Sequence, residues 1–244
     1  MKLTVVIPTY NEAQNLPKLA AALFSLPIPD LHVLVVDDRS PDGTGELARS
    51  LAEEYSGRFG VIVREGKLGL GTAYVDGFQR ALQEGANAIA QMDADFSHDP
   101  ECLVEFLEAL KYHDVILGSR YVPGGKLDER WPRWRKGLSA FGNIYARTIL
   151  NLPVQDATGG YRVWRRESLF NMPLERVRSN GYAFQVEMTY LASRLGYTFA
   201  EVPIYFADRR WGTSKMSFKI QLEAAIRVWQ LLFEYRDLRA SVHA

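Results

Sequence analysis

The feature that most constrains the fold is a regular alternation of short, apolar, β-branched runs with segments of helical periodicity. The runs typical of buried strands are Leu3 to Ile7, Leu31 to Val36, Gly60 to Arg64, Ala88 to Met92 and Val115 to Gly118. Helical spacing of apolar residues follows Asn11, Pro41, Gly69 and Asp99. Because strands joined through helices usually pair in parallel, this order predicts an α/β fold. We expect a single Rossmann-like, mostly parallel sheet with helices on both faces.

The second half of the chain is less regular. From Val122 to Val154 it carries Pro123-Gly124-Gly125 and a run rich in tryptophan and arginine, Arg130 to Arg135. That composition predicts a surface loop, followed by a helix from about Lys136 to Leu150. The remaining expected elements are a helix near Phe184 to Leu195, a strand near Phe199 to Pro203, a basic loop and a final helix from Phe218 to about Arg239.

Composition places the chain among compact globular proteins with one principal domain. We expect that domain over residues 1–216, followed by a C-terminal amphipathic helix over 217–244 at an interface or a membrane surface. Basic and acidic residues number 29 each, which argues against nucleic acid as the main partner. Cys102 is the only cysteine, so no disulfide forms within one chain, and a reducing, cytoplasmic location is expected. The sequence carries neither a signal peptide nor a run of roughly 20 apolar residues.

Polar side chains follow each expected strand at the point where it ends. Pro8 to Glu12 follow the first strand, Asp37-Asp38 the second, Arg64 and a glycine-rich turn the third, and Asp93-Ala94-Asp95 the fourth. In open α/β sheets, ligands bind outside the carboxyl ends of the strands. We therefore expect these groups to converge on one edge of the sheet and to form the binding site there.

The strongest single signal is Asp93-Ala94-Asp95. Two carboxylates at alternate positions, where a strand ends, are suited to a hard cation that also binds phosphate oxygens. Mg²⁺ and Mn²⁺ prefer such oxygen ligands. An isolated Asp-x-Asp is also common in solvated turns. The position after an apolar strand, beside other acidic strand ends, favours the metal.

Two neighbouring motifs allow more than one interpretation. Asp37-Asp38 precede Ser40-Pro41-Asp42-Gly43, so they fit a turn with a helix cap, a phospho-accepting receiver domain, or a carboxylate that recognises a nucleoside. The segment from Lys67 to Thr72 either cradles phosphate with backbone N–H groups or forms a tight turn between strand and helix. It carries neither the dinucleotide fingerprint nor the phosphate-loop signature.

Taken in order, these segments resemble the family 2 glycosyltransferases, which adopt the fold called GT-A. The greatest similarity is to the polyprenol (dolichol) phosphate mannosyltransferases, and it covers nearly the whole chain. The motifs that carry it are VVIPTYNEAQNL, VLVVDDRSPDGTGELA, REGKLGLGTAYVDGF, MDADFSHDP, LGSRYVPGG, DATGGYR and RRWGTSKMS. The resemblance implies transfer of mannose from GDP-mannose to a polyprenyl or dolichyl phosphate.

The resemblance also implies roles for individual residues. The donor-binding residues that it implies are Pro8, Tyr10, Glu12, Val36, Asp38, Lys67, Asp93, Ala94, Asp95, Arg120, Arg209 and Lys215. The implied ligands of Mg²⁺ or Mn²⁺ are Asp93, Asp95 and Ser97, and the implied acceptor-side residues are Asp156, Arg162 and Gln185. The residues expected to be catalytic are Asp95, Arg120, Arg209 and Lys215. Relatives often carry glutamine in place of Ser97, and some carry lysine in place of Ala183, so this chain departs from them at both positions.

The implied chemistry fits a phosphate acceptor. Departure of a nucleoside diphosphate leaves negative charge that a metal and cationic side chains stabilise. A lipid phosphate, with a second pKa of about 6, is already a nucleophile near neutrality and needs positive charge rather than a general base. The cations that supply this charge in the sequence are Arg120, Arg209, Arg210 and Lys215. Direct attack inverts the anomeric centre, so an α-linked donor gives a β-linked mannosyl phosphate.

Three alternatives stand beside this expectation. The first is a UDP donor carrying glucose or N-acetylglucosamine, since no residue distinguishes guanine from uracil. The second is a non-catalytic phospho-receiver module around Asp37-Asp38, which would need a third aspartate where this chain has Arg64. The third is a nicotinamide-dependent reductase, whose glycine fingerprint would stand where this chain has Pro8-Thr9-Tyr10.

Without a membrane span, an enzyme of this kind is expected to lie peripherally on the cytoplasmic face of a membrane. Trp131 and Trp134, set among arginines, suit the interface between lipid and water. So does one side of the final helix, although packing against the domain or a partner chain fits that side equally well. The apolar residues of that side are Ile220, Ala224, Val228, Leu231 and Leu232. A small membrane-anchoring subunit is a further partner that the resemblance allows.

Overall fold

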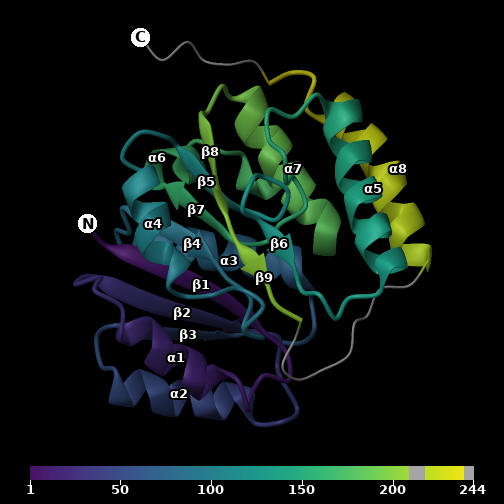
Figure 1. Cartoon of the computed structure of the whole chain (residues 1–244). Helices are drawn as coiled ribbons and strands as arrows, with labels where there is room; N and C mark the ends of the chain where they lie inside the picture. The colour runs from purple at the N-terminus through teal and green to yellow at the C-terminus, as the bar shows by residue number, and fades with distance from the viewer. Residues whose placement is uncertain (209–217, 239–244) are drawn as a thin grey trace.

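A seven-stranded sheet with the order β3-β2-β1-β4-β7-β5-β8 forms the centre of the protein (Figure 1). The structure is a computed structural model that describes residues 1–208 and 218–238, apart from the side chains of 218–223. The strands are β1 (Leu3–Thr9), β2 (Leu31–Asp37), β3 (Phe59–Val63), β4 (Ala88–Gln91), β5 (Val115–Ser119), β7 (Arg162–Arg165) and β8 (Phe199–Pro203). Neighbouring strands run parallel except β7, which is antiparallel to both β4 and β5. A separate parallel pair joins β6 (Lys126–Leu127) to β9 (Tyr205–Phe206).

Helices cover both faces of the sheet, as the sequence predicts. One face carries α1 (Leu16–Phe24), α2 (Thr44–Glu54) and α4 (Cys102–Ala109). The other face carries α3 (Leu70–Gln83), α5 (Arg133–Leu150), α7 (Gly181–Arg194) and α8 (Phe218–Glu234). The short helices α6 (Arg166–Phe170) and η1 (Leu174–Arg176) follow β7. In Figure 1, α5 and α8 lie side by side, next to α7.

Alternation of side chains along the strands creates two cores, one on each face of the sheet. In β1, Leu3, Val5 and Ile7 belong to the core under α1, α2 and α4, whereas Val6 belongs to the core under α3 and α7. Helix α3 approaches the sheet closely at Gly77, where a Cβ would lie 2.3 Å from Val6 Cγ1. A larger residue at position 77 would therefore push the helix away from the strand.

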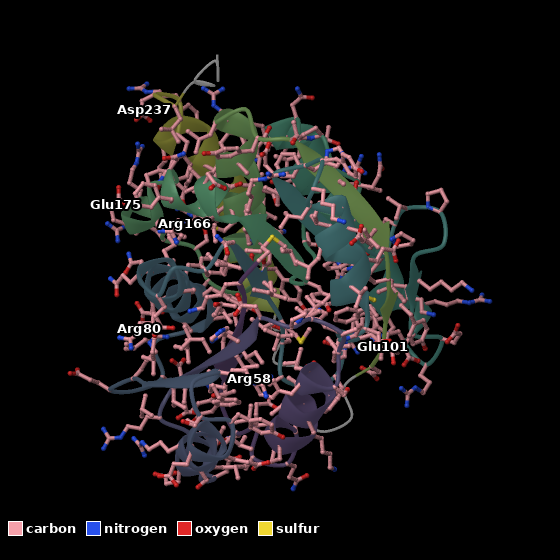
Figure 2. All side chains as sticks on the ribbon, turned by 90° about the vertical axis from the view of Figure 1, so that its left-hand side faces the viewer. Arg58, Arg80, Glu101, Arg166, Glu175 and Asp237 are labelled. Carbon is pink, nitrogen blue, oxygen red and sulfur yellow. The ribbon has the colours of Figure 1, made fainter. Side chains whose placement is uncertain are left out.

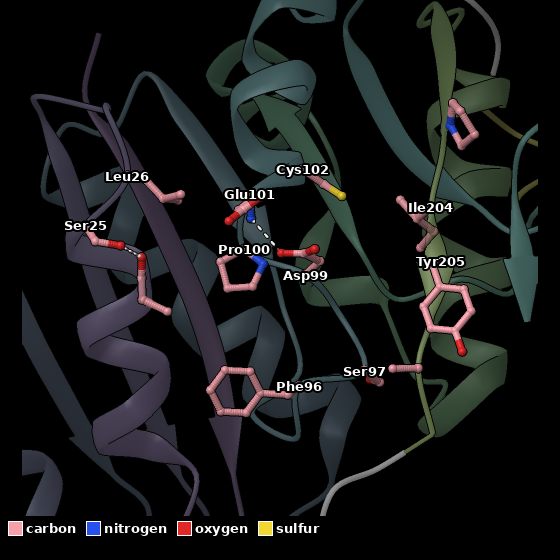
Figure 3. A pocket seen from close by; sticks show the side chains of 13 residues that line it. Ser25, Leu26, Phe96, Ser97, Asp99, Pro100, Glu101, Cys102, Ile204 and Tyr205 are labelled. Carbon is pink, nitrogen blue, oxygen red and sulfur yellow. Dashed lines mark hydrogen bonds between the residues drawn. The ribbon is translucent and has the colours of Figure 1, made fainter. Parts of the chain in front are cut away.

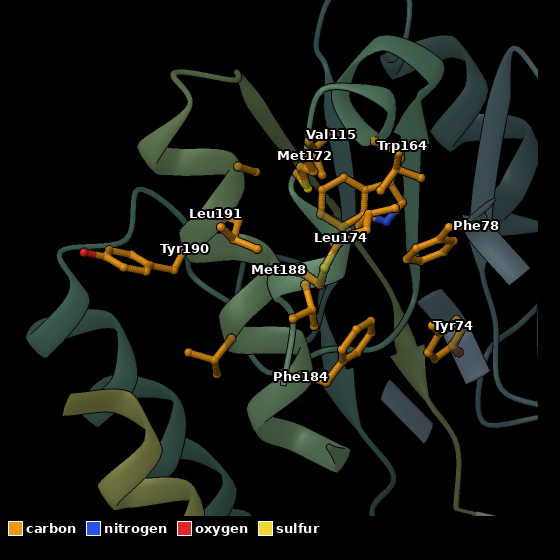
Figure 4. Close-up of a cluster of buried hydrophobic side chains, with 14 of the residues drawn as sticks. Tyr74, Phe78, Val115, Trp164, Met172, Leu174, Phe184, Met188, Tyr190 and Leu191 are labelled. Carbon is orange, nitrogen blue, oxygen red and sulfur yellow. The ribbon is translucent and has the colours of Figure 1, made fainter. Parts of the chain in front are cut away.

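The core under α3 and α7 is rich in large side chains. Trp164 of β7 lies with Phe78, Phe184 and Met188 in this cluster (Figure 4). Burying one such side chain stabilises a fold by roughly 1.5–3 kcal/mol, so the cluster holds the helices firmly to the sheet. Charged side chains, such as that of Arg80, point outward from the ribbon (Figure 2).

The predicted α/β architecture is confirmed, with one strand of the central sheet, β7, and the short pair β6 and β9 that were not expected. The six predicted strands begin and end within two residues of the observed ones. Strand β7 was missed because it has only four residues, Arg162–Arg165, with an arginine at each end, and so carries little periodicity. It enters the sheet between β4 and β5 and brings the segment that precedes it to the carboxyl end of the sheet.

The prediction that Trp131 lies at a membrane interface is wrong. Its side chain is buried, and its Nε1 donates a hydrogen bond to Asp208 Oδ1 at 3.1 Å. The Arg135 guanidinium lies 3.5 Å from the centre of the Trp131 ring. Of the two tryptophans only Trp134 is exposed, at 70%. Local composition could not predict which of the two tryptophans is buried. Burial of Trp131 depends on β9 and on Asp208, more than 70 residues further along the chain.

The final helix packs against the domain, which was one of the two interpretations that the sequence left open. Val228 and Leu231, on the side expected at the membrane, are buried in the core with α7. Among the described side chains of α8, from residue 224 onward, the exposed large apolar ones are instead Ile226, Trp229 and Phe233. The side chain of Ile220 lies outside the described residues. Within the part of the chain that the structure describes, no helix is long and apolar enough to cross a membrane.

Candidate active site

The carboxyl ends of β1, β2 and β4 meet at one edge of the sheet. The parallel register sets Pro8 beside Val36, and Asp38 N–H donates a hydrogen bond of 3.0 Å to the Thr9 carbonyl. On the other side of β1, Met92 N–H donates to the Val6 carbonyl at 3.2 Å. The polar segments that follow these strands therefore share one rim, as their positions in the sequence predict.

Asp37 shapes the turn after β2. Its Oδ1 accepts hydrogen bonds from Thr9 Oγ1 at 2.9 Å and from Ser40 Oγ at 2.6 Å, and its Oδ2 accepts one from Ser40 N–H at 2.9 Å. The side chain is 1% exposed. These contacts support the turn interpretation for Asp37 and leave Asp38 as the carboxylate that faces the rim.

Asp38 is held by a buried arginine that the sequence marked only as the end of a strand. Arg64 Nη1 donates to Asp38 Oδ1 at 2.7 Å, and Gly69 N–H donates to Asp38 Oδ2 at 3.0 Å. Arg64 Nη2 also donates to Thr72 Oγ1 at 2.6 Å. One guanidinium thus joins the ends of β2 and β3 to the first turn of α3, and fixes the direction of the Asp38 carboxylate.

The glycine-rich segment before α3 forms a tight turn. Gly71 N–H, at the start of the helix, already donates to Asn180 Oδ1 at 3.2 Å. A Cβ at residue 71 would lie 2.2 Å from the Ser179 carbonyl oxygen, so the two backbones are in direct contact. The structure therefore favours the tight-turn interpretation over a phosphate cradle. From the same turn, Lys67 reaches across the rim, with Nζ 3.7 Å from the centre of the Tyr10 ring.

Asp93, at the end of β4, is fixed by two neighbours. Tyr74 Oη donates to Asp93 Oδ1 at 3.2 Å, and Asp93 N–H donates to His98 Nδ1 at 3.0 Å. Tyr74 is fully buried. Burial, together with the charge of Asp93, raises the pKa of Tyr74 well above its ordinary value, so its hydroxyl stays protonated and can donate. Because Tyr74 lies at the helical spacing of an ordinary core residue, no sequence pattern indicates this role.

Asp95 and Ser97 lie on the turn that follows. Ser97 N–H donates to Asp95 Oδ1 at 3.0 Å. Ser97 Oγ is buried and makes no hydrogen bond to any described residue, so a hydroxyl ligand is available there. Among the described residues no cluster of three or more His, Cys, Asp or Glu side chains surrounds a metal position. The carboxylates of Asp93 and Asp95 nevertheless fit Mg²⁺ or Mn²⁺, which commonly takes one or two carboxylates and completes its shell with phosphates and water.

Gly160 brings the segment before β7 against the acidic turn. A Cβ there would lie 3.3 Å from Gln185 Nε2, 3.5 Å from His98 Cε1 and 3.9 Å from Asp93 Oδ2. The backbone of residue 160 therefore lies close to Asp93, one of the candidate metal ligands. This contact joins the donor-side rim to the segment that carries Asp156.

Arg120 and Asp156 form a buried ion pair at the end of β5. Arg120 Nε and Nη2 lie 2.7 and 2.8 Å from the two carboxylate oxygens, and Nη2 also donates to Thr158 Oγ1 at 2.8 Å. Burial by itself raises the pKa of Asp156. The charge and hydrogen bonds of Arg120 lower it by more, so the pKa is lowered overall and the carboxylate stays ionised. Among the described residues, Arg120 Nη1 has no hydrogen-bond partner, so this N–H group is available to a ligand.

Arg162 and Gln185 are buried beneath this segment. Arg162 donates to the carbonyls of Gly159, Ala157 and Gln185 at 2.9–3.0 Å, so it fixes the backbone of the segment. Burial lowers the pKa of Arg162 to about 9, which still leaves it cationic at neutrality. The contacts in the structure make Arg162 a support of the segment that carries Asp156 rather than an exposed contact.

Of the other residues implied in donor binding, some are buried in the cores, one lies on the rim and two lie outside the described residues. The side chains of Val36 and Ala94 belong to the two cores, so only their main chains are available to a ligand. Glu12 lies on the rim, where its Oε2 accepts from Asn15 Nδ2 at 2.7 Å. Arg209 and Lys215 lie outside the described residues, as does Arg210.

A cavity of about 400 Å³ lies on the other side of the acidic turn, between α1 and the segment from β8 to β9. Figure 3 shows it bounded by Leu26 on one side and by Ile204 and Tyr205 on the other, with Phe96 and Ser97 on the turn itself. The cavity thus leaves room for a group that approaches Ser97 from this side.

Relatives of known sequence match almost the whole chain. An undecaprenyl-phosphate mannosyltransferase of Micrococcus luteus is 45% identical over 242 residues, which cover 98% of each protein. A polyprenol monophosphomannose synthase of Mycolicibacterium smegmatis is 45% identical over 225 residues, covering 92% of this chain and 84% of that protein. Both exceed by far the similarity that a shared fold alone would produce.

Solved structures agree on the fold. Glucosyl-3-phosphoglycerate synthase of Mycobacterium tuberculosis, in complex with Mn²⁺, uridine diphosphate and phosphoglyceric acid, superposes with a TM-score of 0.66 at 18% identity. The match covers 98% of this chain and 80% of that one. A second structure, described as a mycobacterial protein, gives 0.64 at 16% identity, over 95% and 73% of the two chains. The sheet and its helices are those of the GT-A fold.

The profile of glycosyl transferase family 2 matches residues 4–170. That span contains Asp38, the acidic turn from Asp93 to Ser97, and the Arg120–Asp156 pair. With the GT-A fold, the two relatives that are 45% identical and the convergence of these groups on one rim, the chain belongs to glycosyltransferase family 2.

Proposed function

We propose that this protein transfers mannose from GDP-mannose to a polyprenyl phosphate and gives polyprenyl phosphate β-mannose. The observation that carries the proposal is the 45% identity, over nearly the whole chain, to proteins named for transfer of mannose to such lipids. The arrangement of acidic and basic groups on the rim fits this chemistry. It offers carboxylates for a metal at one side and a buried cation at the other.

The proposed metal is Mg²⁺ or Mn²⁺, held by Asp93, Asp95 and Ser97. Such an ion neutralises charge that develops on the departing diphosphate. Tyr74 and the Ser97 N–H each donate to one of the two carboxylates and so hold them in place. The fold neighbour from Mycobacterium tuberculosis binds Mn²⁺ with uridine diphosphate, and it is related to this chain by fold alone.

The proposed donor site extends from the acidic turn along the rim to Asp38. Tyr10 and Lys67 lie together there, and the backbones at Pro8 and Val36 form its floor. Asp38, fixed by Arg64, accepts hydrogen bonds from the nucleoside. Glu12, Ala94 and Arg120 complete the described part of the site. Arg209 and Lys215, which the resemblance places on the phosphates, remain a prediction outside the described residues.

The proposed acceptor side favours a phosphate nucleophile over a sugar hydroxyl. A hydroxyl needs a general base within hydrogen-bond reach. The carboxylate on this side, Asp156, is bound on both oxygens by Arg120 and is therefore a poor base. A phosphate dianion needs a cation instead, and Arg120 Nη1 supplies one. A single in-line displacement by this phosphate inverts the anomeric centre, which accounts for the β-linked product.

We propose that the protein acts at the surface of a membrane. Trp134, Phe141 and Ile144 recur on one side of α5 and are 70%, 65% and 57% exposed. On the described part of α8, Ile226, Trp229 and Phe233 are the exposed large apolar side chains. The two rows adjoin, because Trp229 Nε1 donates to Tyr145 Oη at 2.9 Å. We call this surface the α5–α8 apolar face. A lipid acceptor and exposed tryptophans together favour a bilayer as its partner.

A transfer assay tests the proposed reaction. The parent protein, with labelled GDP-mannose, Mg²⁺ or Mn²⁺ and a polyprenyl phosphate, should move label into the organic phase. Asp95→Ala should lose most of this activity, because one of the proposed metal ligands is removed. Parallel reactions with UDP-glucose and UDP-N-acetylglucosamine test the alternative donors. Transfer from a UDP-sugar alone, or an α-linked product by proton NMR, would refute the proposal.

A further inference from the structure

A continuous run of hydrogen bonds leads from the last helix to the donor-binding turn. It begins at Arg227 of α8, whose Nε donates to Ser179 Oγ at 2.8 Å. Ser179 belongs to the short segment between η1 and α7. This segment lies far from α8 in the sequence, so the contact is a specific link between two parts of the fold.

A buried carboxylate makes this link strong. Glu187 of α7 is fully buried, and its Oε1 lies 3.0 Å from Arg227 Nη2. Its Oε2 accepts Ser179 N–H at 2.8 Å, and its Oε1 also accepts Tyr235 Oη at 2.6 Å. A charge buried this deeply requires a cationic partner. Arg227 is that partner, and it therefore fixes both Glu187 and the main chain at Ser179.

The segment held by Arg227 supports the glycine turn directly. Asn180 Oδ1 accepts Gly71 N–H at 3.2 Å and so caps the start of α3. The Ser179 carbonyl oxygen would lie 2.2 Å from a Cβ on residue 71. Any shift of residues 179–180 must therefore move the turn as well, since no space separates them.

The Gly69–Gly71 turn positions the residues proposed to bind the donor. Gly69 N–H donates to Asp38 Oδ2 at 3.0 Å, and the Gly69 carbonyl accepts from Arg64 Nη1 at 3.2 Å. Lys67, two residues earlier, reaches Tyr10. The groups proposed to hold the nucleoside are thus aligned by a turn whose other side rests on Asn180.

We propose that Arg227 is a positioning residue for donor binding, which acts through Ser179 and Asn180 on the Gly69–Gly71 turn. It does not touch the donor. This role rests on the proposed function, because the turn has a nucleotide to hold only if a nucleoside diphosphate binds beside it. Helix α8 then does more than close the core, since its docking sets the affinity of a site on another part of the molecule.

Calorimetric titration of the full-length protein with GDP and MnCl₂ tests the role of Arg227. Arg227→Gln should raise the dissociation constant of GDP at least threefold, while the KM for polyprenyl phosphate stays at the parent value. Arg227→Lys should recover part of the affinity, because an ammonium group can still reach Glu187. Ser179→Ala removes only the Ser179 hydroxyl bond. It should give a smaller loss of affinity and serves as the test if Arg227→Gln does not fold.

Asp237→Asn is the matched control. Asp237 lies at the surface (Figure 2) and pairs with Arg176 at 2.7 Å, so it attaches the segment just after α8 but does not contact Ser179. Parent-like GDP affinity in this variant supports the specific link. Equal losses in Arg227→Gln and Asp237→Asn, or parent-like affinity in both Arg227→Gln and Ser179→Ala, would overturn it. If the parent protein itself binds neither GDP nor UDP with Mn²⁺, the proposed function fails first, and the role of Arg227 falls with it.

Discussion

Asp156 and Arg120 hold each other through two parallel hydrogen bonds, with Nε and Nη2 of the arginine at 2.7 and 2.8 Å from the two carboxylate oxygens. Their side chains are 0% and 4% exposed, so both charges are removed from water. The pair joins the end of β5 to the segment that reaches Gly160 and the acidic turn. Its stability and its geometry therefore affect the proposed acceptor side together.

Asp156→Asn should destabilise the protein and reduce its sensitivity to acid. The variant leaves the charge of Arg120 buried without a partner, so we expect a loss of about 3–5 kcal/mol in the free energy of unfolding at neutral pH. The pKa of Asp156 is lowered in the folded protein. Its contribution is therefore complete above the ordinary aspartate pKa of about 3.9 and is lost as the pH falls below that value. Denaturant unfolding at a series of pH values from neutral to acidic measures both effects.

Glu108→Gln provides the comparison for Asp156→Asn. Glu108 forms a surface ion pair with Lys111, with its side chain 67% exposed. This substitution should leave the pH dependence of unfolding close to that of the parent protein. If the parent and Asp156→Asn lose stability in parallel as the pH falls, the ion pair does not have the role described.

Arg64→Met should weaken donor binding more than catalysis. The variant removes the guanidinium that fixes Asp38, and loss of one partner of a buried charged pair costs roughly 2–5 kcal/mol of interaction. We expect the KM for GDP-mannose to rise at least tenfold, with a smaller change in kcat. Steady-state kinetics at a fixed acceptor concentration measure this split. Asp76→Asn is the control, because Asp76 lies 3.1 Å from Arg64 Nε but is 46% exposed and does not contact Asp38. A fall in kcat alone would contradict the positioning role.

The parallel part of the fold could be predicted because each strand carries its own signal. Runs such as Leu31 to Val36 are apolar on both faces, which is typical of a strand covered by helices on both sides. Strand β7 carries no such signal, and its antiparallel place between β4 and β5 depends on contacts that no local pattern encodes. Trp131 and Trp134 also show that a local pattern cannot predict burial. Trp131 is buried by a segment distant in the sequence, whereas Trp134 is exposed.

The candidate site was predictable where the chemistry follows a strand directly. Asp38 and Asp93 lie at strand ends, so their convergence follows from the parallel sheet alone. Tyr74 and Asn180 were missed because each contacts the site from an element whose sequence is typical of ordinary packing or of a loop. Their roles arise from contacts across 19 and 109 residues of sequence, which only the folded chain brings together.

Tyr74→Phe should weaken metal use without loss of the fold. The phenyl ring can keep the stacking on Phe184, whose ring centre lies 5.6 Å away, while the hydrogen bond to Asp93 is lost. Removing a group that orients a metal ligand commonly reduces metal affinity by about 10–100-fold. The Mn²⁺ concentration for half-maximal activity should therefore rise by about tenfold. Tyr197→Phe, whose hydroxyl donates to the Glu167 carbonyl, should leave it unchanged. An unchanged Mn²⁺ requirement in Tyr74→Phe would show that Asp93 needs no such support.

Cys102 should react slowly with thiol reagents. Burial, together with the charge of Asp99, raises the pKa of Cys102 to about 11, so very little thiolate is present at pH 8. An ordinary cysteine, with a pKa of about 8.5, reacts mainly through its thiolate. The native protein should therefore react with Ellman's reagent about a hundredfold more slowly than the urea-unfolded chain. Because Cys102 is the only cysteine, the absorbance change reports one site. Equal rates in the two states would exclude the raised pKa.

The α5–α8 apolar face should bind anionic lipid vesicles. Each exposed aromatic ring that leaves water on binding contributes roughly 1.5–3 kcal/mol at full burial, so replacing two of them should lower the partition coefficient at least about tenfold. Phe141→Ser with Phe233→Ser makes this change at two residues that are 65% and 69% exposed and whose loss leaves the core intact. Co-sedimentation with vesicles of phosphatidylglycerol and phosphatidylcholine measures the partition.

Tyr112→Ser is the matched control, since its ring is 81% exposed and follows α4, which covers the opposite face of the sheet from α5 and α8. It should bind vesicles like the parent protein. Because Phe141 and Phe233 lie outside the rim, the double variant should keep its affinity for GDP while it loses lipid binding and turnover of membrane-embedded acceptor. Parent-like vesicle binding by the double variant would show that the α5–α8 apolar face does not bind the bilayer. Equal losses in the double variant and Tyr112→Ser would mean that any exposed ring contributes, so that no particular face is selected.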